Sequence, residues 1–172
     1  MVEVVLRAVR VDVGSSTPLL LLEEVGGERV LPIYIGAPEA TAIAYALQHI
    51  DTPRPMSHDL LGNVITALGA RLFAVEITHL VENTFYANLR LLREGREILV
   101  SARPSDAVAL ALRVGAPLLV SDELMNDQGQ VLDVGDDDVE TEGVEESVES
   151  EADLVAELRD FLNNVRPEDF DQ

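Results

Sequence analysis

Residues 53–61 read Pro-Arg-Pro-Met-Ser-His-Asp-Leu-Leu and bring a guanidinium, a hydroxyl, an imidazole and a carboxylate close together. The two prolines fix their own φ and favour extended geometry in the residues before them, so the backbone sets the direction of Arg54. Ser57 is expected to cap a helix that begins at Asp59, where a negative charge is favoured. His58 then lies at the helix start, able to exchange protons or bind a metal ion. The alternative is a rigid helix entry in which His58 is structural.

A second stretch with chemical groups reads Ser-Ala-Arg-Pro-Ser-Asp-Ala at residues 101–107. Arg103 is expected at the end of a strand, with Ser105 and Asp106 in the first turn of the following helix. Free backbone N–H groups beside a guanidinium favour an anion, so Arg103 and Ser105 are candidate phosphate-binding residues. The alternative is that Asp106 only caps the helix while Arg103 pairs with a nearby acid.

Together the two stretches supply the groups that phosphodiester cleavage requires. A base or a metal ion activates water, and cations stabilise the charge that develops on the phosphorus oxygens. The candidate acids, bases, metal ligands and phosphate clamps are Glu39, Arg54, His58, Asp59, Arg103 and Asp106. Their spacing does not establish that they meet in space. The sequence has no His-x-x-x-His pair, no Gly-x-Ser-x-Gly elbow and no Gly-rich phosphate loop.

The elements that must position these groups follow a repeated order. Alternating and apolar runs predict strands over residues 2–12, 18–23 and 29–35, then an alanine-rich helix from Gly36 to about His49. The second half repeats this order, with strands over 73–80, 84–92 and 98–102 and a helix over about 104–114. A further helix is expected over 59–68, closed by Gly69. A short apolar segment covers 118–121.

The repeat reaches individual residues where the third strand of each half meets its helix. Residues 39–44 align with 106–111, because an acid opens each helix and alternating alanines follow. Small side chains at those positions allow close packing on a sheet. We therefore predict an α+β fold, a largely antiparallel sheet with flanking helices, built from a duplicated β-β-β-α unit.

Composition places the chain among globular proteins. It has 172 residues, 47% of them hydrophobic, and no cysteine. No apolar run reaches the roughly 18 residues of a membrane span, and the first residues resemble a strand rather than a signal peptide. We therefore expect no membrane partner, and the absence of cysteine suits a cytoplasmic protein.

The acidic charge lies mostly in the last third of the chain. Residues 1–121 contain 10 arginines and 13 acids, whereas residues 122–172 contain 2 arginines and 19 acids. We predict a folded domain over 1–132, an acidic disordered linker over 133–152, and an amphipathic helix with a tail over 153–172. That helix, and the apolar surface that an open sheet leaves, predict a homo-oligomer.

Four segments in order resemble the bifunctional nuclease (BFN) domain family, named for reported DNase and RNase activity. They are residues 31–40, 53–61, 84–89 and 102–111, within a similarity that runs from the first strand to about Ser121. Residues 161–170 also resemble the end of bacterial, actinobacterial-like members. One position departs from the family pattern: members commonly have an aspartate where this chain has Ser101. If that carboxylate were a metal ligand, activity would be weakened here.

The resemblance implies a nuclease that hydrolyses DNA and RNA with little sequence preference, with nucleic acid as its partner. It implies Mg²⁺ or Mn²⁺ as a candidate cofactor. With the chemistry above, it assigns His58 as base or ligand, Asp59 and Asp106 as metal ligands with Glu39 behind them, and the arginines to phosphate.

The alternative is a non-catalytic oligomeric binding or regulatory protein whose arginine-flanked helix starts hold an anionic ligand or partner. The nearly neutral body, the acidic tail and the few aromatic residues favour this alternative.

Overall fold

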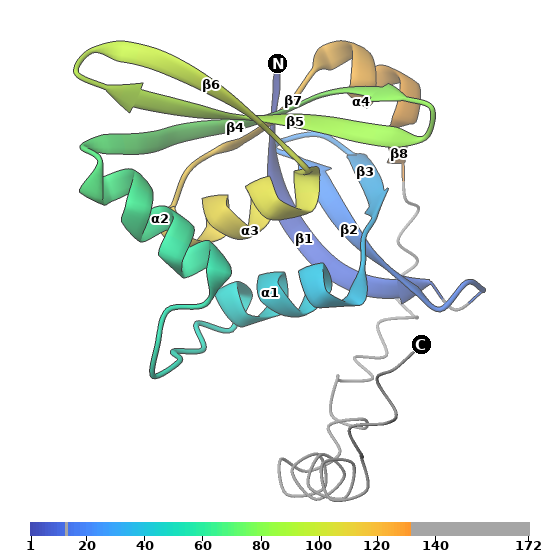
Figure 1. Ribbon diagram of the computed structural model, residues 1–172. Helices are drawn as coiled ribbons and strands as arrows, with labels where there is room; N and C mark the ends of the chain where they lie inside the picture. The colour runs from blue at the N-terminus through green and yellow to red at the C-terminus, as the bar shows by residue number, and fades with distance from the viewer. Residues whose placement is uncertain (13, 132–172) are drawn as a thin grey trace, which may run out of the picture. The chain divides into compact units, whose positions relative to one another are not determined.

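The computed structural model describes residues 1–12 and 14–131, which form a single sheet packed against helices (Figure 1). The strands are β1 Val2–Asp12, β2 Thr17–Glu24, β3 Arg29–Tyr34, β4 Ala70–Val81, β5 Thr84–Arg93, β6 Arg96–Ala102, β7 Leu118–Val120 and β8 Gln130–Val131. The helices are α1 Ala37–Leu47, α2 Ser57–Ala67, α3 Pro104–Val114 and α4 Asp122–Gln128. The eight strands of this part of the chain lie in the order β6-β5-β4-β7-β1-β2-β3-β8.

The sheet confirms the predicted fold class and the repeated order of elements. Strands β1, β2 and β3 form one antiparallel meander followed by α1, and β4, β5 and β6 form another followed by α3. Neighbouring strands are antiparallel except β4 and β7, which are parallel. The fold is therefore α+β with a largely antiparallel sheet.

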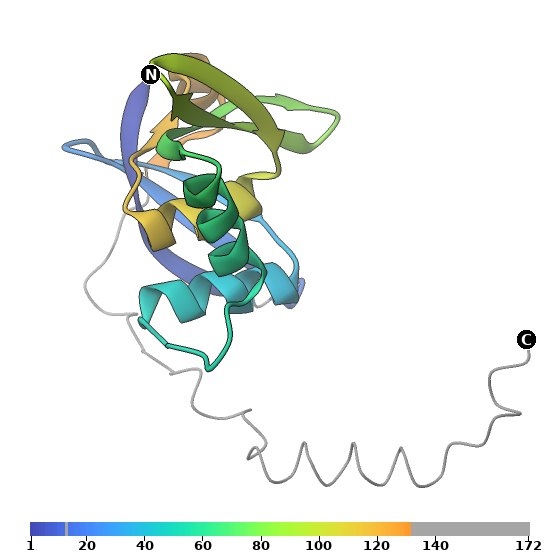
Figure 2. The same ribbon diagram turned by 60° about the vertical axis from the view of Figure 1, so that its left-hand side comes forward.

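The short strand β7 joins the two meanders. Val120 pairs with Val2 of β1 on one side and with Ile77 of β4 on the other. Leu118 and Val120 are buried, so β7 contributes to the core despite its three residues. The two meanders extend outward from β7 in opposite directions, and this places α1 and α3 side by side (Figure 2).

Helix α3 lies at the centre of the packing. It contacts α1, α2, β4 and β5. Ala107, Ala109 and Ala111 are at most 1% exposed, and Val108 and Leu110 are fully buried between them. Small side chains allow close approach of the neighbouring elements, which confirms the packing predicted from the alternating alanines. Burial of a valine or leucine stabilises the fold by about 1.5–3 kcal/mol, so α3 is firmly held.

Three details of the secondary structure differ from the sequence predictions. The predicted capping by Ser57 is wrong, because α2 begins at Ser57 and its N-cap residue is Met56. The Asp59 carboxylate instead accepts the Met56 N–H at 2.9 Å. Helix α1 ends at Leu47, short of His49, whose φ of 52° leaves the helical region. Neither α4 nor β8 was predicted.

The remaining sequence predictions concern the acidic end of the chain, oligomer formation and the membrane. The acidic linker over 133–152 and the helix over 153–172 lie outside the described residues. Homo-oligomer formation stays a prediction. The apolar surface on which this prediction depends is present at the edge strand β6, where Ile98, Leu99 and Val100 are exposed. In the described part of the chain, no helix is long and apolar enough to cross a membrane.

Candidate active site

Three helices place an acid at the same position of their first turn. The N-cap residues of α1, α2 and α3 are Gly36, Met56 and Arg103, so the third helical residues are Glu39, Asp59 and Asp106. A negative charge there is stabilised by the unpaired N–H groups and the dipole of the helix. The shared position explains why a carboxylate lies near the start of each helix.

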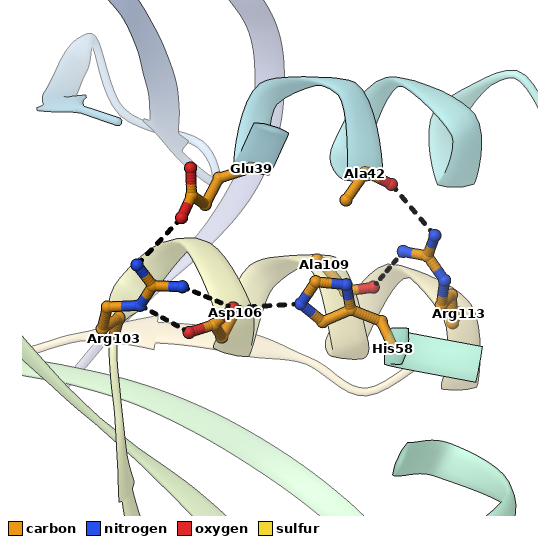
Figure 3. A network of polar contacts seen from close by, with 7 residues as sticks. All are labelled: Glu39, Ala42, His58, Arg103, Asp106, Ala109 and Arg113. Atoms are coloured by element: carbon orange, nitrogen blue, oxygen red, sulfur yellow. Dashed lines mark hydrogen bonds and ion pairs between the residues drawn. The ribbon is translucent and has the colours of Figure 1, made fainter. Parts of the chain in front are cut away.

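Arg103 joins two of these acids (Figure 3). Its Nε and one terminal nitrogen contact the Asp106 carboxylate at 2.7 and 3.2 Å, and the other terminal nitrogen contacts Glu39 at 2.8 Å. The guanidinium therefore links the starts of α1 and α3. Its side chain is still 65% exposed, so one face of the cation remains open to an incoming anion.

His58 from α2 reaches the same carboxylate. Its Nε2 lies 3.1 Å from Asp106 Oδ1, and its side chain is 14% exposed. An ionised carboxylate only accepts hydrogen bonds, so Nε2 carries the hydrogen in this contact. A neutral ring held in this way has Nδ1 as its basic nitrogen. The pair is thus arranged for His58 to accept a proton while Asp106 orients the ring.

Electrostatics keep Asp106 ionised. Burial alone raises the pKa of Asp106, but the hydrogen bonds from Arg103 and His58 outweigh burial and lower that pKa below its ordinary value. In turn, Asp106 first and Glu39 second raise the pKa of Arg103. With a neutral His58, the group of Glu39, Arg103 and Asp106 carries a formal charge of −1.

Asp59 is bound to an arginine that sequence reasoning missed. Arg113 contacts the Asp59 carboxylate, and its terminal nitrogens donate to the carbonyls of Ala109 at 2.9 Å and Ala42 at 3.0 Å. Burial raises the pKa of Asp59, but the Met56 N–H and Arg113 lower it more strongly. Arg113 is 12% exposed and ties together α1, α2 and α3. Asp59 therefore positions α2, and with it His58.

A signal for Arg113 was present in the sequence. It follows Asp106 by seven residues, which is two helical turns, so both residues share one face of α3. That face is the one on which α1 and α2 pack.

Three adjoining cavities follow α1 and α3 from their first to their last turns. The central cavity, of about 320 Å³, is lined by His58, Arg103 and Asp106. The start cavity, of about 340 Å³, shares Glu39 and Arg103 with it. The end cavity, of about 430 Å³, shares His58 and Arg113 with the central one. Eleven helical residues span about 16 Å, so the three cavities follow one another over a length comparable to that of a few nucleotides.

Other residues singled out from the sequence do not line the central cavity. The Arg54 side chain is exposed, lines none of the three cavities, and makes no ion pair or side-chain hydrogen bond within the described residues. Ser105 faces the start cavity rather than the central one. Ser101 is exposed on β6 and lines none of the three. His79, interpreted as structural, stacks on Tyr86 with ring centroids 4.6 Å apart.

The three predicted metal ligands do not form a common coordination site. Glu39 and Asp106 are both bound to Arg103, and Asp59 is bound to Arg113. Among the residues that the structure describes, no group of three histidines or acids is arranged to hold a metal ion. With these ion pairs formed, the three acids do not fit a divalent cation.

Comparisons with known proteins agree with the resemblance noted above. The model of the bifunctional nuclease domain matches residues 20–133. An uncharacterized protein of Mycobacterium tuberculosis is 44% identical over 168 residues, which cover 98% of this chain and 97% of that protein.

Two plant proteins match more distantly. Bifunctional nuclease 1 of Oryza sativa subsp. indica is 28% identical over 121 residues, which cover 69% of this chain and 37% of the rice protein. Bifunctional nuclease 2 of Arabidopsis thaliana is 26% identical over 121 residues, which cover 68% of this chain and 37% of that protein. The matches thus span little more than a third of each plant protein. Because the family model covers well over half of the chain, this chain belongs to the bifunctional nuclease domain family.

Proposed function

We propose that this protein hydrolyses phosphodiester bonds in DNA and RNA with little sequence preference. The observation that carries the proposal is the pair of His58 and Asp106, 3.1 Å apart beside the exposed guanidinium of Arg103 in the central cavity. Such a set provides a base, its orienting acid and a cation for the phosphate. Membership of the family supports the same activity.

In the proposed reaction, a phosphodiester in the central cavity binds to the open face of Arg103. His58 Nδ1 accepts a proton from a water molecule, whose oxygen forms a bond to phosphorus. The bond between phosphorus and the leaving oxygen breaks, and the leaving oxygen takes a proton from solvent. Arg103 stabilises the negative charge on the phosphoryl oxygens during this step. Asp106 keeps the His58 ring in the required tautomer.

The proposed contacts explain the low sequence preference. Arg103 and His58 act on the phosphate and on water, which are common to every nucleotide in DNA and RNA. Phosphate contacts position a nucleic acid but carry no sequence information.

One observation favours the second candidate, a non-catalytic protein that binds an anionic ligand or the acidic segment of a partner. Each acid of the cluster is already bound to an arginine, as in a structural link between three helices. In this case Arg103, open on one face, binds the anion and His58 only fixes α2 to α3.

The test compares cleavage of single-stranded DNA, duplex DNA and RNA by purified wild type, Asp106→Asn and Asp127→Asn. Asp127 lies on α4, outside the three cavities, and its variant changes the charge equally. We expect a loss of at least ~10-fold in Asp106→Asn and none in Asp127→Asn, with folding checked by melting temperature. Parallel assays with chelator, and with Mg²⁺ or Mn²⁺ added back, test the predicted cofactor. Equal cleavage by both variants would remove the basis of the proposal, and binding without cleavage would favour the second candidate.

A further inference from the structure

The start cavity has features that the proposed reaction does not use. Helices α1 and α3 both begin there, with Gly36 and Arg103 as their N-cap residues and Pro38 and Pro104 in their first turns. The remaining unpaired N–H groups of the two first turns, to which the prolines contribute none, thus lie at one region of about 340 Å³. Two helix dipoles and a guanidinium together favour a negative charge at this place.

An independent observation comes from Ser105. This residue is only 6% exposed and lines the start cavity, yet its hydroxyl has no hydrogen-bond partner among the described residues. In that part of the chain, every side-chain oxygen or nitrogen that is sealed from solvent has a hydrogen-bond partner. The Ser105 hydroxyl has none, so it is not sealed. Since Ser105 lines the start cavity, its hydroxyl opens into that cavity. A buried hydroxyl that can donate is available to an oxygen of a bound ligand.

Aromatic rings border the same cavity. The chain has only 3 tyrosines and 4 phenylalanines, and both Tyr34 and Phe85 line this region. Tyr34 is 59% exposed, and its hydroxyl donates to Asp12 at 3.3 Å, which holds the ring at the end of β3. An exposed ring beside an anion site offers a stacking surface for a nucleobase, and every base has a face that can stack.

The Glu39 carboxylate already lies beside Arg103 at the edge of the start cavity. A Cβ on Gly36 would clash with Glu39 Oε2, so the Glu39 carboxylate folds back over the start of α1. The same carboxylate binds Arg103. It therefore occupies, within the chain, the position that suits an external anion.

We propose that the start cavity is a nucleotide subsite next to the cleavage centre. The phosphate takes the place of the Glu39 carboxylate and is bound by Arg103 and the Ser105 hydroxyl, while the base stacks on Tyr34. This assignment rests on the proposed nuclease function for its substrate, but its binding chemistry is independent of cleavage.

Calorimetric titration with adenosine 5′-monophosphate, adenosine and inorganic phosphate tests the subsite. The variants are Ser105→Ala and Tyr34→Ala, each with a matched control outside the three cavities, Ser101→Ala and Tyr86→Ala. We expect the monophosphate to bind wild type more tightly than adenosine or phosphate does. Ser105→Ala should weaken its binding by ~2–10-fold, and Tyr34→Ala by at least ~5-fold. The controls should bind as wild type does.

Equal affinity of all five proteins for the monophosphate, or no binding by wild type, would overturn the subsite. Melting temperatures show whether each variant is folded, and Tyr34 is exposed enough for its replacement to be tolerated. Cleavage is measured separately. If both variants lose binding of the monophosphate and wild type does not cleave nucleic acid, the subsite is retained and the nuclease function is rejected. If wild type cleaves nucleic acid and both variants bind the monophosphate as wild type does, the nuclease function is retained and the subsite is rejected.

Discussion

Replacing Glu39 by glutamine should tighten the binding of nucleic acid. In the folded chain, Glu39 and Asp106 share the single positive charge of Arg103, at 2.8 and 2.7 Å. The variant keeps the size of the side chain but removes one negative charge. The formal charge of the group then changes from −1 to 0, so a phosphate meets less repulsion.

Coulomb's law sets the size of this effect. For a phosphate about 6 Å from the Glu39 carboxylate, repulsion costs about 0.7 kcal/mol in bulk water and about 3 kcal/mol at an effective dielectric constant of 20. Because Arg103 is 65% exposed, water screens this repulsion, and its cost lies in the lower half of the range from about 0.7 to about 3 kcal/mol. About 1–2 kcal/mol corresponds to a Kd that is ~5–30-fold lower in the variant. The lost ion pair should cost stability at most about 1 kcal/mol.

Fluorescence anisotropy with a labelled single-stranded DNA oligonucleotide at low salt measures this change. His58→Ala is the background, so that cleavage does not consume the probe. Glu28→Gln in the same background is the control, because Glu28 is exposed in the turn between β2 and β3 and has no part in the cluster. Equal affinity of the Glu39 and Glu28 variants, or weaker binding by the Glu39 variant, would refute the competition between Glu39 and phosphate.

Three further results follow from the geometry. Asp106 has a folded-state pKa below its ordinary value of 3.8, so it stabilises the fold above that pH and ceases to do so as pH falls through the lower folded pKa. The stability gap between wild type and Asp106→Asn, measured by urea unfolding, should thus be fully present at neutral pH and shrink as pH falls below 3.8; a gap that stays constant with pH would contradict the assignment. Arg113→Met should lower the free energy of unfolding by about 2–3 kcal/mol, because it breaks the link between three helices, whereas Arg54→Met, at an exposed position, should change it little. Circular single-stranded DNA should be cleaved, because a further cavity adjoins the central cavity on each side; an uncut circle beside a degraded linear strand would show that a chain end is required.

Much of the fold could be predicted because it depends on local patterns. Alternation located the six long strands, and the acid followed by alanines located α1 and α3 together with their equivalence. The place of β7 could not be predicted, since three apolar residues do not indicate which strands they pair with. Helix α4 was missed although Ser121, whose hydroxyl accepts the Leu124 N–H, precedes two acids in the pattern of a helix start.

The site was harder to predict because its residues come from distant parts of the chain. His58 and Asp106 are 48 positions apart, and only the packing of α2 on α3 brings them together. Residue types and the family resemblance selected both of them, together with Arg103 and Glu39. Arg54 was selected by its neighbours in sequence, but the loop leaves it exposed and apart from the cluster. No rule on sequence spacing could tell that Arg103 joins the cluster while Arg54 does not.

The base role of His58 is tested most directly by chemical rescue. Single-turnover cleavage of a single-stranded DNA oligonucleotide is measured with His58→Ala, with and without added imidazole. We predict a loss of ~10²–10⁴-fold in the variant, and a rate that rises with imidazole concentration while wild type and His79→Ala do not respond. A contaminating nuclease would not show this pattern. Cleavage by His58→Ala at the wild-type rate, or a loss that imidazole leaves unchanged in the folded variant, would contradict the assignment of His58 as the base.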